Sequence, residues 1–158
     1  MRQKLDKLIA LNQLLGAALV MGAIIVAAVQ EASPLQPLHV FGSFLIAGIA
    51  STAGILLWRG LPRGHFLSLI IQGVQVLGIN TFTQTYHIEL GAEVNLAFIT
   101  VGPNTYLGFD SGIRGVFAIW TWSGLAANVL TINLLALVAF IYLWRRSFVS
   151  RRAASTRK

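Results

Sequence analysis

The 158-residue sequence contains no cysteine, and only 11% of its residues are charged. Without cysteine, a small fold held together by disulfide bonds is excluded. An ordinary soluble domain carries about 25% charged residues, so most of this chain is not suited to face water. Hydrophobic residues make up 56% of the sequence, and its mean hydropathy is +0.72. The composition therefore indicates an integral membrane protein, and the length indicates a single domain covering residues 1–158.

Proline is also scarce, and its four copies all lie outside the long apolar stretches. A membrane-spanning helix needs about 20 mostly apolar residues, and a proline inside it removes a backbone hydrogen bond. Four proline-free stretches meet this length: residues 8–29, 39–58, 65–83 and 120–144. We therefore expect a mainly α-helical integral membrane fold, a bundle of four transmembrane helices.

Acidic residues number five against twelve basic residues, which gives a net charge of +7. The basic residues gather near the N-terminus, in the short loop after residue 58 and in the tail, residues 145–158. With four spans these regions share one side of the membrane, and basic flanks are retained in the cytoplasm. We expect cytoplasmic N- and C-termini in a bacterial inner membrane, and no nucleic-acid partner. The tail residues expected to contact anionic lipid are Arg145, Arg146, Arg151 and Arg152.

Residues 84–119, between the third and fourth expected helices, alternate between polar and apolar side chains. The stretches 85–90 and 93–98 follow this period of two and contain tyrosine, isoleucine, valine and phenylalanine, which is typical of strands with one covered face. Turns are expected at residues 91–92, 102–104 and 110–112. The pattern predicts a small antiparallel sheet of three or four strands on the outer, extracytoplasmic surface.

None of the expected spans carries a charged residue in its middle, and proton relays and ion pathways usually depend on such residues. The polar residues that remain are neutral, and such side chains commonly hydrogen-bond across helix contacts. Those expected to pack the helices together are Ser51, Gln72, Gln75, Asn128, Thr131 and Asn133. An alternative is a small oligomeric transporter or channel with a neutral path along the third and fourth helices, lined by Gln72, Gln75, Asn128 and Thr131.

Metal binding and catalysis find little support in the motifs. Histidine is a common metal ligand, but His39 and His65 begin spans from opposite sides, and no close histidine pair completes a ligand set. We therefore expect no metal and no other cofactor. Acid–base catalysis needs two suitably placed groups, and nothing in the sequence pairs Asp110 with another outer acid. A second alternative is a lipid-modifying enzyme at the outer surface that uses His87 and Asp110.

These features together favour a non-enzymatic membrane protein, an accessory or self-assembling structural subunit. Its distinguishing part is the outer sheet, because an exposed sheet edge can recruit a strand from another chain. We expect contacts with the lipid bilayer, and with copies of the chain itself or other subunits of a larger membrane complex. The residues expected to bind a partner are Tyr86, His87, Glu89, Tyr106, Phe109, Asp110 and Arg114.

Overall fold

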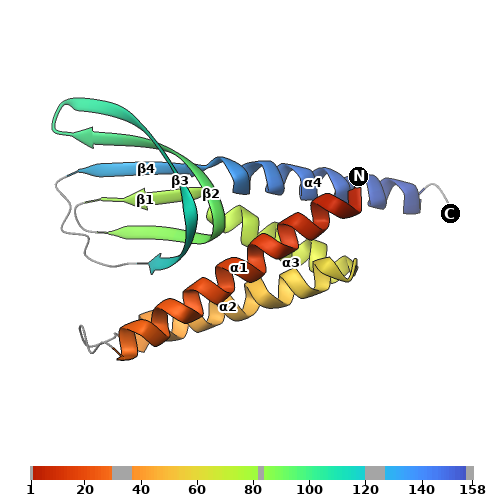
Figure 1. Cartoon of the computed structure of the whole chain (residues 1–158). Coiled ribbons are helices and arrows are strands. Elements are labelled where there is room, and N and C mark those ends of the chain that lie inside the picture. Colours follow the sequence, from red (N-terminus) through yellow and green to blue (C-terminus); the bar gives the residue numbers. More distant parts are fainter. Residues whose placement is uncertain (1, 30–36, 82–83, 120–126, 156–158) are drawn as a thin grey trace.

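The computed structural model describes residues 2–29, 37–81, 84–119 and 127–155. Within these ranges the chain forms four helices and a four-stranded antiparallel sheet (Figure 1). The helices are α1 (Arg2–Val29), α2 (Pro37–Trp58), α3 (Pro62–Gln75) and α4 (Leu134–Ser155). The strands are β1 (Leu77–Asn80), β2 (Thr85–Val101), β3 (Asn104–Ile119) and β4 (Asn128–Asn133). The sheet forms one end of the molecule, and α4 leads away from it toward the end where α1 begins (Figure 1).

The two longest apolar helices, α1 and α2, pack against one another (Figure 1). Their contact is built from small side chains, and both Ala10 and Ala50 are fully buried. Small residues let two helix backbones approach closely, and a Cβ added at Gly54 would lie 3.0 Å from the carbonyl oxygen of Ala10. Within these helices, Gln3–Val29 and Val40–Trp58 are long and apolar enough to cross a membrane.

The expectation of four transmembrane helices is wrong, because only two helices of the described chain qualify as candidate spans. The third apolar stretch, residues 65–83, is helical only in its first part and then continues as β1. The fourth, residues 120–144, contains β4 before α4 begins. An apolar run alone does not distinguish helix from strand, and in β4 the buried positions Thr131 and Asn133 alternate with less buried neighbours. The fold is therefore mixed α and β.

The sheet is curled: its two long strands, β2 and β3, wrap around its two short strands, β1 and β4 (Figure 1). Its strand order is β1–β4–β2–β3, and β1 also pairs with the beginning of β2. The strands β2 and β3 form one long hairpin, whose register runs from Tyr86 opposite Ile119 to Val101 opposite Asn104. Because β4 pairs with the second half of β2, β2 bends around the β1–β4 pair (Figure 1).

Of the three turns expected in residues 84–119, only the one at residues 102–104 is present. Gly102 has a φ of +57°, which suits the first central residue of a two-residue type II′ hairpin turn. The chain continues as strand through residues 91–92 and 110–112, so those two expectations are wrong. The segment expected to hold three or four strands therefore holds two long ones, and the other two come from the flanking apolar stretches.

The bend of β2 packs directly against the middle of α1. The amide of Asn12 donates to the carbonyl oxygens of Leu90 and Ala92, each at 3.3 Å, and accepts from the Ala92 N–H at 2.5 Å. Gly91 has a φ of +92°, and a Cβ there would lie 2.4 Å from the Asn12 carbonyl oxygen. A Cβ at Gly16 would lie 2.3 Å from the Leu90 carbonyl carbon. Asn12 and the two glycines therefore fix where the hairpin bends.

Candidate functional site

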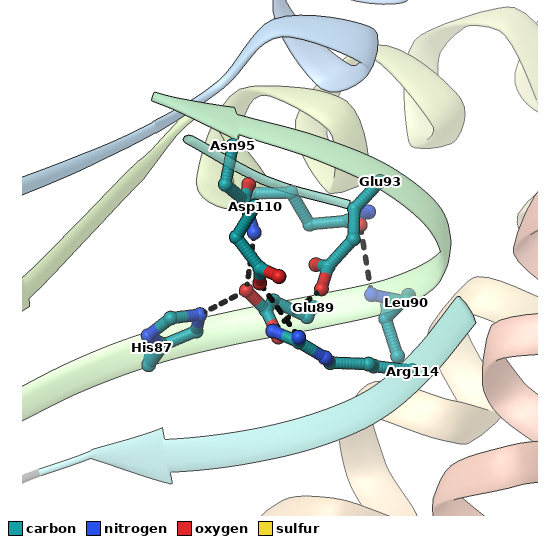
Figure 2. Close-up of polar contacts among 8 residues, drawn as sticks. His87, Glu89, Leu90, Glu93, Asn95, Asp110 and Arg114 are labelled. Carbon is teal, nitrogen blue, oxygen red and sulfur yellow. Dashed lines mark hydrogen bonds and ion pairs between the residues drawn. The ribbon is translucent and has the colours of Figure 1, made fainter. Parts of the chain in front are cut away.

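Polar side chains converge on one face of the β2–β3 hairpin at its bend (Figure 2). Alternate residues of a strand share a face, and the register places Asn95 opposite Asp110 and Gly91 opposite Arg114. The polar residues of β2 and β3 therefore meet on the same side of the hairpin. This group, which we name the acidic cluster, consists of His87, Glu89, Glu93, Asn95, Asp110 and Arg114.

Arg114 is the cation around which the acids gather. Its Nη1 lies 3.1 Å from Glu93 Oε1 and 3.7 Å from Glu89 Oε2, and its Nη2 lies 2.6 Å from Asp110 Oδ2. Glu89 is 3% exposed and Glu93 is 2% exposed, whereas half of the Asp110 side chain is exposed. Three carboxylates thus meet one guanidinium, so negative charge is in excess even when His87 carries a proton.

Glu89 has the most partners among the acids of the cluster. Its Oε1 contacts His87 Nε2 and accepts a 2.8 Å hydrogen bond from Asn95 Nδ2. Burial raises the pKa of Glu89, but the contact with His87 and the neighbouring Glu93 carboxyl, with the charges of His87 and Arg114, outweigh burial and hold this pKa below its usual value. Glu89 is therefore the ionised member of the carboxyl pair at neutral pH.

The carboxyl oxygens of Glu93 have fewer hydrogen-bond partners than those of Glu89. Both of its carboxyl oxygens are buried and neither accepts a hydrogen bond from a described residue, although Oε1 lies within ion-pair distance of Arg114. Burial raises the pKa of Glu93, and the adjacent Glu89 raises it further, to about 7, against the opposing effects of the Asn95 amide and the charge of Arg114. Two adjacent carboxylates repel one another when both are ionised, so the pair holds one proton up to nearly neutral pH.

The cluster is anchored to α3 by hydrogen bonds to the bend. The backbone N–H of Leu90 donates to Gln75 Oε1 at 3.0 Å, and Gln75 Nε2 donates to the Ile71 carbonyl oxygen at 3.1 Å. The Tyr86 hydroxyl donates to the Val74 carbonyl oxygen at 2.7 Å. Together with Asn12 of α1, these contacts hold the strand rigidly beneath Glu89 and Glu93.

The structure brings together only part of the partner-binding set expected from the sequence. His87, Glu89, Asp110 and Arg114 meet in the acidic cluster. The other three lie elsewhere: Tyr86 binds α3, whereas Tyr106 and Phe109 are 56% and 69% exposed on β3. The expected set therefore divides into a buried polar group and an exposed apolar group.

Sequence reasoning missed Glu93 and Asn95 as members of the site. The signal was present, because residues 87, 89, 93 and 95 are all odd-numbered positions of one strand and so share a face. What could not be seen was that the strand passes through Gly91 without turning. An assumed turn at that glycine separates Glu89 from Glu93, whereas the continuous strand places them side by side.

Two amides expected to pack the helices do not contact one another. Gln75 is engaged with Leu90 of β2, as described above. Asn133 Oδ1 accepts a 3.0 Å hydrogen bond from the Ala136 N–H, which makes Asn133 the cap of the first turn of α4. Each amide therefore stabilises a junction between helix and strand, a kind of junction that an all-helical bundle does not contain.

The remaining neutral polar residues are dispersed among separate elements of the described structure. Asn128 is exposed at the start of β4, and Thr131 is buried opposite Gly78 of β1. Ser51 is half-buried on α2. Gln72 faces a groove between α1 and α4. The expectation that these residues lie in four transmembrane helices is wrong for Asn128 and Thr131, because both belong to a strand, and for Gln72, because α3 is not a candidate span in the described chain.

A second polar group lies at the opposite end of the helices. Asp6 of α1 is 5% exposed, contacts the guanidinium of Arg146, and accepts a 3.1 Å hydrogen bond from the Tyr142 hydroxyl. His65 Nε2 of α3 lies 3.9 Å from the same carboxylate. This group, which we name the Asp6 cluster (Asp6, His65, Tyr142 and Arg146), ties α1, α3 and α4 together.

The arginines expected to contact anionic lipid are placed unevenly. Arg146 is engaged by Asp6, whereas Arg145 is exposed. The side chains of Arg151 and Arg152 lie outside those that the structure describes. In the described part of the chain, no group of three histidine, aspartate or glutamate side chains is placed to hold a metal ion.

No family model, curated protein or solved structure matches this chain. Its function is therefore inferred from the geometry of the acidic cluster, the hairpin and the two candidate membrane helices.

Proposed function

We propose that the protein is a non-enzymatic membrane component that assembles with a second copy of itself through the free edge of β3. The helices α1 and α2 anchor it in the bilayer, with both termini in the cytoplasm of a bacterial inner membrane. The basic residues beside Trp58 and in the tail support this orientation. The contact between Asp6 and Arg146 supports it too, because it keeps the two ends of the chain on one side.

The observation that carries this proposal is the edge of β3. This strand is 16 residues long and, in the described structure, pairs only with β2. Its exposed side chains include Tyr106, Leu107, Phe109 and Ile113, each more than half exposed. A long apolar edge strand is a template for pairing with another chain, and a second copy offers a matching edge across a two-fold axis.

The hairpin geometry indicates which backbone groups are free for such pairing. A two-residue turn makes Val101 and Asn104 a hydrogen-bonded pair, and pairs of this kind alternate along an antiparallel ladder. The N–H groups of Thr105, Leu107 and Phe109 therefore point away from β2. Proline at one of these positions removes an outward donor and leaves the β2–β3 ladder intact.

The test compares the oligomeric state of Leu107→Pro with that of Leu107→Ala in mild detergent. Both variants lose the leucine side chain, but only the first loses the outward N–H. We expect the wild type and Leu107→Ala to form dimers, and Leu107→Pro to raise the dissociation constant at least about tenfold, a cost of about 1.4 kcal/mol. A monomeric wild type, with no cross-linked dimer in native membranes, would contradict the proposal.

A second candidate function, control of this assembly by protons, is favoured by the position of the acidic cluster. Glu93 of β2 is buried next to Glu89 and lies 3.1 Å from Arg114 of β3; His87 contacts Glu89, and Asp110 contacts Arg114. The elements packed behind it, α1 and α3, contribute the neutral amides of Asn12 and Gln75. Ionisation of Glu93 therefore adds an unbalanced charge between the two strands that set the shape of the β3 edge.

The matched experiment follows dimer formation from about pH 5.5 to about pH 8.5. We expect the dissociation constant of the wild type to change across this range, because the pKa of Glu93 is about 7. Glu93→Gln, which keeps a neutral side chain of the same shape, should remove the change. If the dissociation constant of the wild-type dimer does not change with pH, control by protons is rejected, whereas the dimer contact through the β3 edge is not.

A further inference from the structure

An apolar groove of about 310 Å³ lies between α1, α3 and α4. The apolar part of its lining comes from α1 and α4. Leu5 and Leu8 of α1 form one wall, and Leu135, Val138 and Ala139 of α4 form the other. Leu8 and Val138 are 61% and 66% exposed, so the groove opens along the outer surface of the helices.

A buried amide with no protein partner faces this groove. Gln72 is 2% exposed and lines the groove from α3, yet no hydrogen bond joins its side chain to another described residue. The other amide in the lining, Asn12, is fully occupied by the backbone of Leu90 and Ala92. The amide atoms of Gln72 are not among the fully buried polar atoms without a partner, so they reach the space of the groove and are open to a hydrogen bond from its occupant.

The groove is also free of charge in its described lining. Its end nearest the chain termini is formed by Leu5 and Tyr142, and the Tyr142 hydroxyl is bonded to Asp6, which in turn holds Arg146. The charged groups of Asp6 and Arg146 near this end therefore contact each other and do not line the groove. A molecule that fills the groove has to be apolar along most of its length and neutral where it meets Gln72.

We propose that this groove binds a neutral lipid-soluble molecule taken from the bilayer, with a hydroxyl or carbonyl oxygen hydrogen-bonded to Gln72. The candidate span Gln3–Val29 includes the α1 wall of the groove, so membrane lipid supplies the occupant directly. An apolar chain fills the space between the leucines, and its single oxygen satisfies the amide that the protein leaves unpaired. This site is separate from the β3 edge and does not depend on assembly.

The test uses a photoactivatable diazirine derivative of decanol, added to the full-length protein in lipid vesicles. Cross-linked peptides should come from the α1 and α4 walls. Excess decanol should suppress the labelling, whereas decane, which lacks the oxygen, should suppress it at least about fivefold less efficiently. Equal competition by the two compounds, or labelling spread evenly over all exposed apolar faces, would overturn the proposal.

Two variants distinguish the contribution of the hydrogen bond to Gln72 from that of the open space in the groove. Gln72→Leu keeps the bulk of the side chain and should reduce labelling at least about fivefold, with loss of the preference for decanol over decane. Ala139→Phe fills the groove while leaving Gln72 in place, and should abolish labelling of the walls. The matched control is Gln84→Leu, the same change at an exposed position outside the groove, which should label like the wild type. Unchanged labelling in both groove variants would also overturn the proposal.

Discussion

The two polar clusters of the molecule balance their charges in opposite ways. In the Asp6 cluster one buried carboxylate meets one guanidinium and one tyrosine hydroxyl, with His65 3.9 Å away, so the charges of Asp6 and Arg146 are matched. In the acidic cluster two buried carboxyls and a half-exposed one share Arg114 and His87. The first group pairs its one carboxylate with one guanidinium, whereas the second has more carboxyl groups than guanidinium groups and reduces its surplus negative charge by holding a proton.

This difference indicates different roles. The Asp6 cluster joins three helices near both ends of the described chain, which is a structural role. The acidic cluster lies where the long hairpin bends, between the strand held by α1 and the strand with the free edge. A group with a pKa of about 7 at that place supports the proposed control of assembly by protons. We therefore propose that the Asp6 cluster stabilises the fold and that the acidic cluster responds to pH.

The largest expected effect comes from removing the cation of the acidic cluster. Arg114→Met leaves Glu89 and Glu93 buried without a counter-charge, and breaking such a pair is strongly destabilising. Because the Arg114 side chain is 41% exposed, we expect the free energy of unfolding at about pH 8 to fall by about 2–4 kcal/mol. The loss should be smaller at about pH 6, where the carboxyls take up protons instead.

Denaturant titration in detergent measures this loss, and Arg59→Met is the matched control because Arg59 is exposed. The control should change stability by less than about 0.5 kcal/mol. Equal losses for Arg114→Met at both pH values would mean that the acids take up no proton, and the contrast between the clusters would disappear.

Removing the acid of the other cluster should have a smaller effect that does not depend on pH. Asp6→Asn leaves Arg146 and Tyr142 without their charged acceptor, but the Arg146 side chain is 38% exposed and water replaces part of the contact. We expect a loss of about 2 kcal/mol at both about pH 6 and about pH 8, measured by the same titration. A loss that vanishes at the lower pH would show that this cluster also has a surplus proton.

The smallest expected effect is the pH dependence that belongs to Glu93 alone. Its pKa is about 7 in the folded protein against 4.5 without the fold, so between these values the folded state binds more protons than the unfolded state. Stability should therefore be greatest at the acid end of this window and fall as the pH rises through 7. Glu89 does not contribute in this window, because its pKa is lowered rather than raised.

Glu93→Gln should flatten this part of the stability curve, and Asp110→Asn serves as the control because Asp110 is half-exposed. The control should retain the slope between about pH 5 and about pH 8 and change stability by less than about 1 kcal/mol. A slope that persists in Glu93→Gln would assign the titration to another group.

The first half of the fold follows from sequence more directly than the second half. The stretches 8–29 and 39–58 lie within α1 and α2, because long apolar runs without proline have few other solutions. Residues 65–83 and 120–144 are also rich in apolar side chains but change from helix to strand and from strand to helix. That change depends on long-range pairing, since β1 exists only because β4 and β2 lie beside it.

The candidate site shows the same limit at the scale of single residues. Alternation along β2 predicted a strand with one polar face, and four of the seven expected residues belong to the acidic cluster. The pairing of Glu89 with Glu93 was not predictable, because Gly91 is as typical of a turn as of a bend. Only the packing of Asn12 and Gly16 against that glycine decides between the two.

The most direct test of the shared proton is infrared spectroscopy of the carboxyl groups as a function of pH, with the wild type compared with Glu93→Gln. The account predicts a protonated carboxyl C=O band in the wild type that persists at about pH 6, disappears with a midpoint of about pH 7, and is missing from Glu93→Gln. If the wild type shows no such band at about pH 6, or if Glu93→Gln retains it, the surplus proton does not reside on Glu93 and the assigned role of the acidic cluster is contradicted.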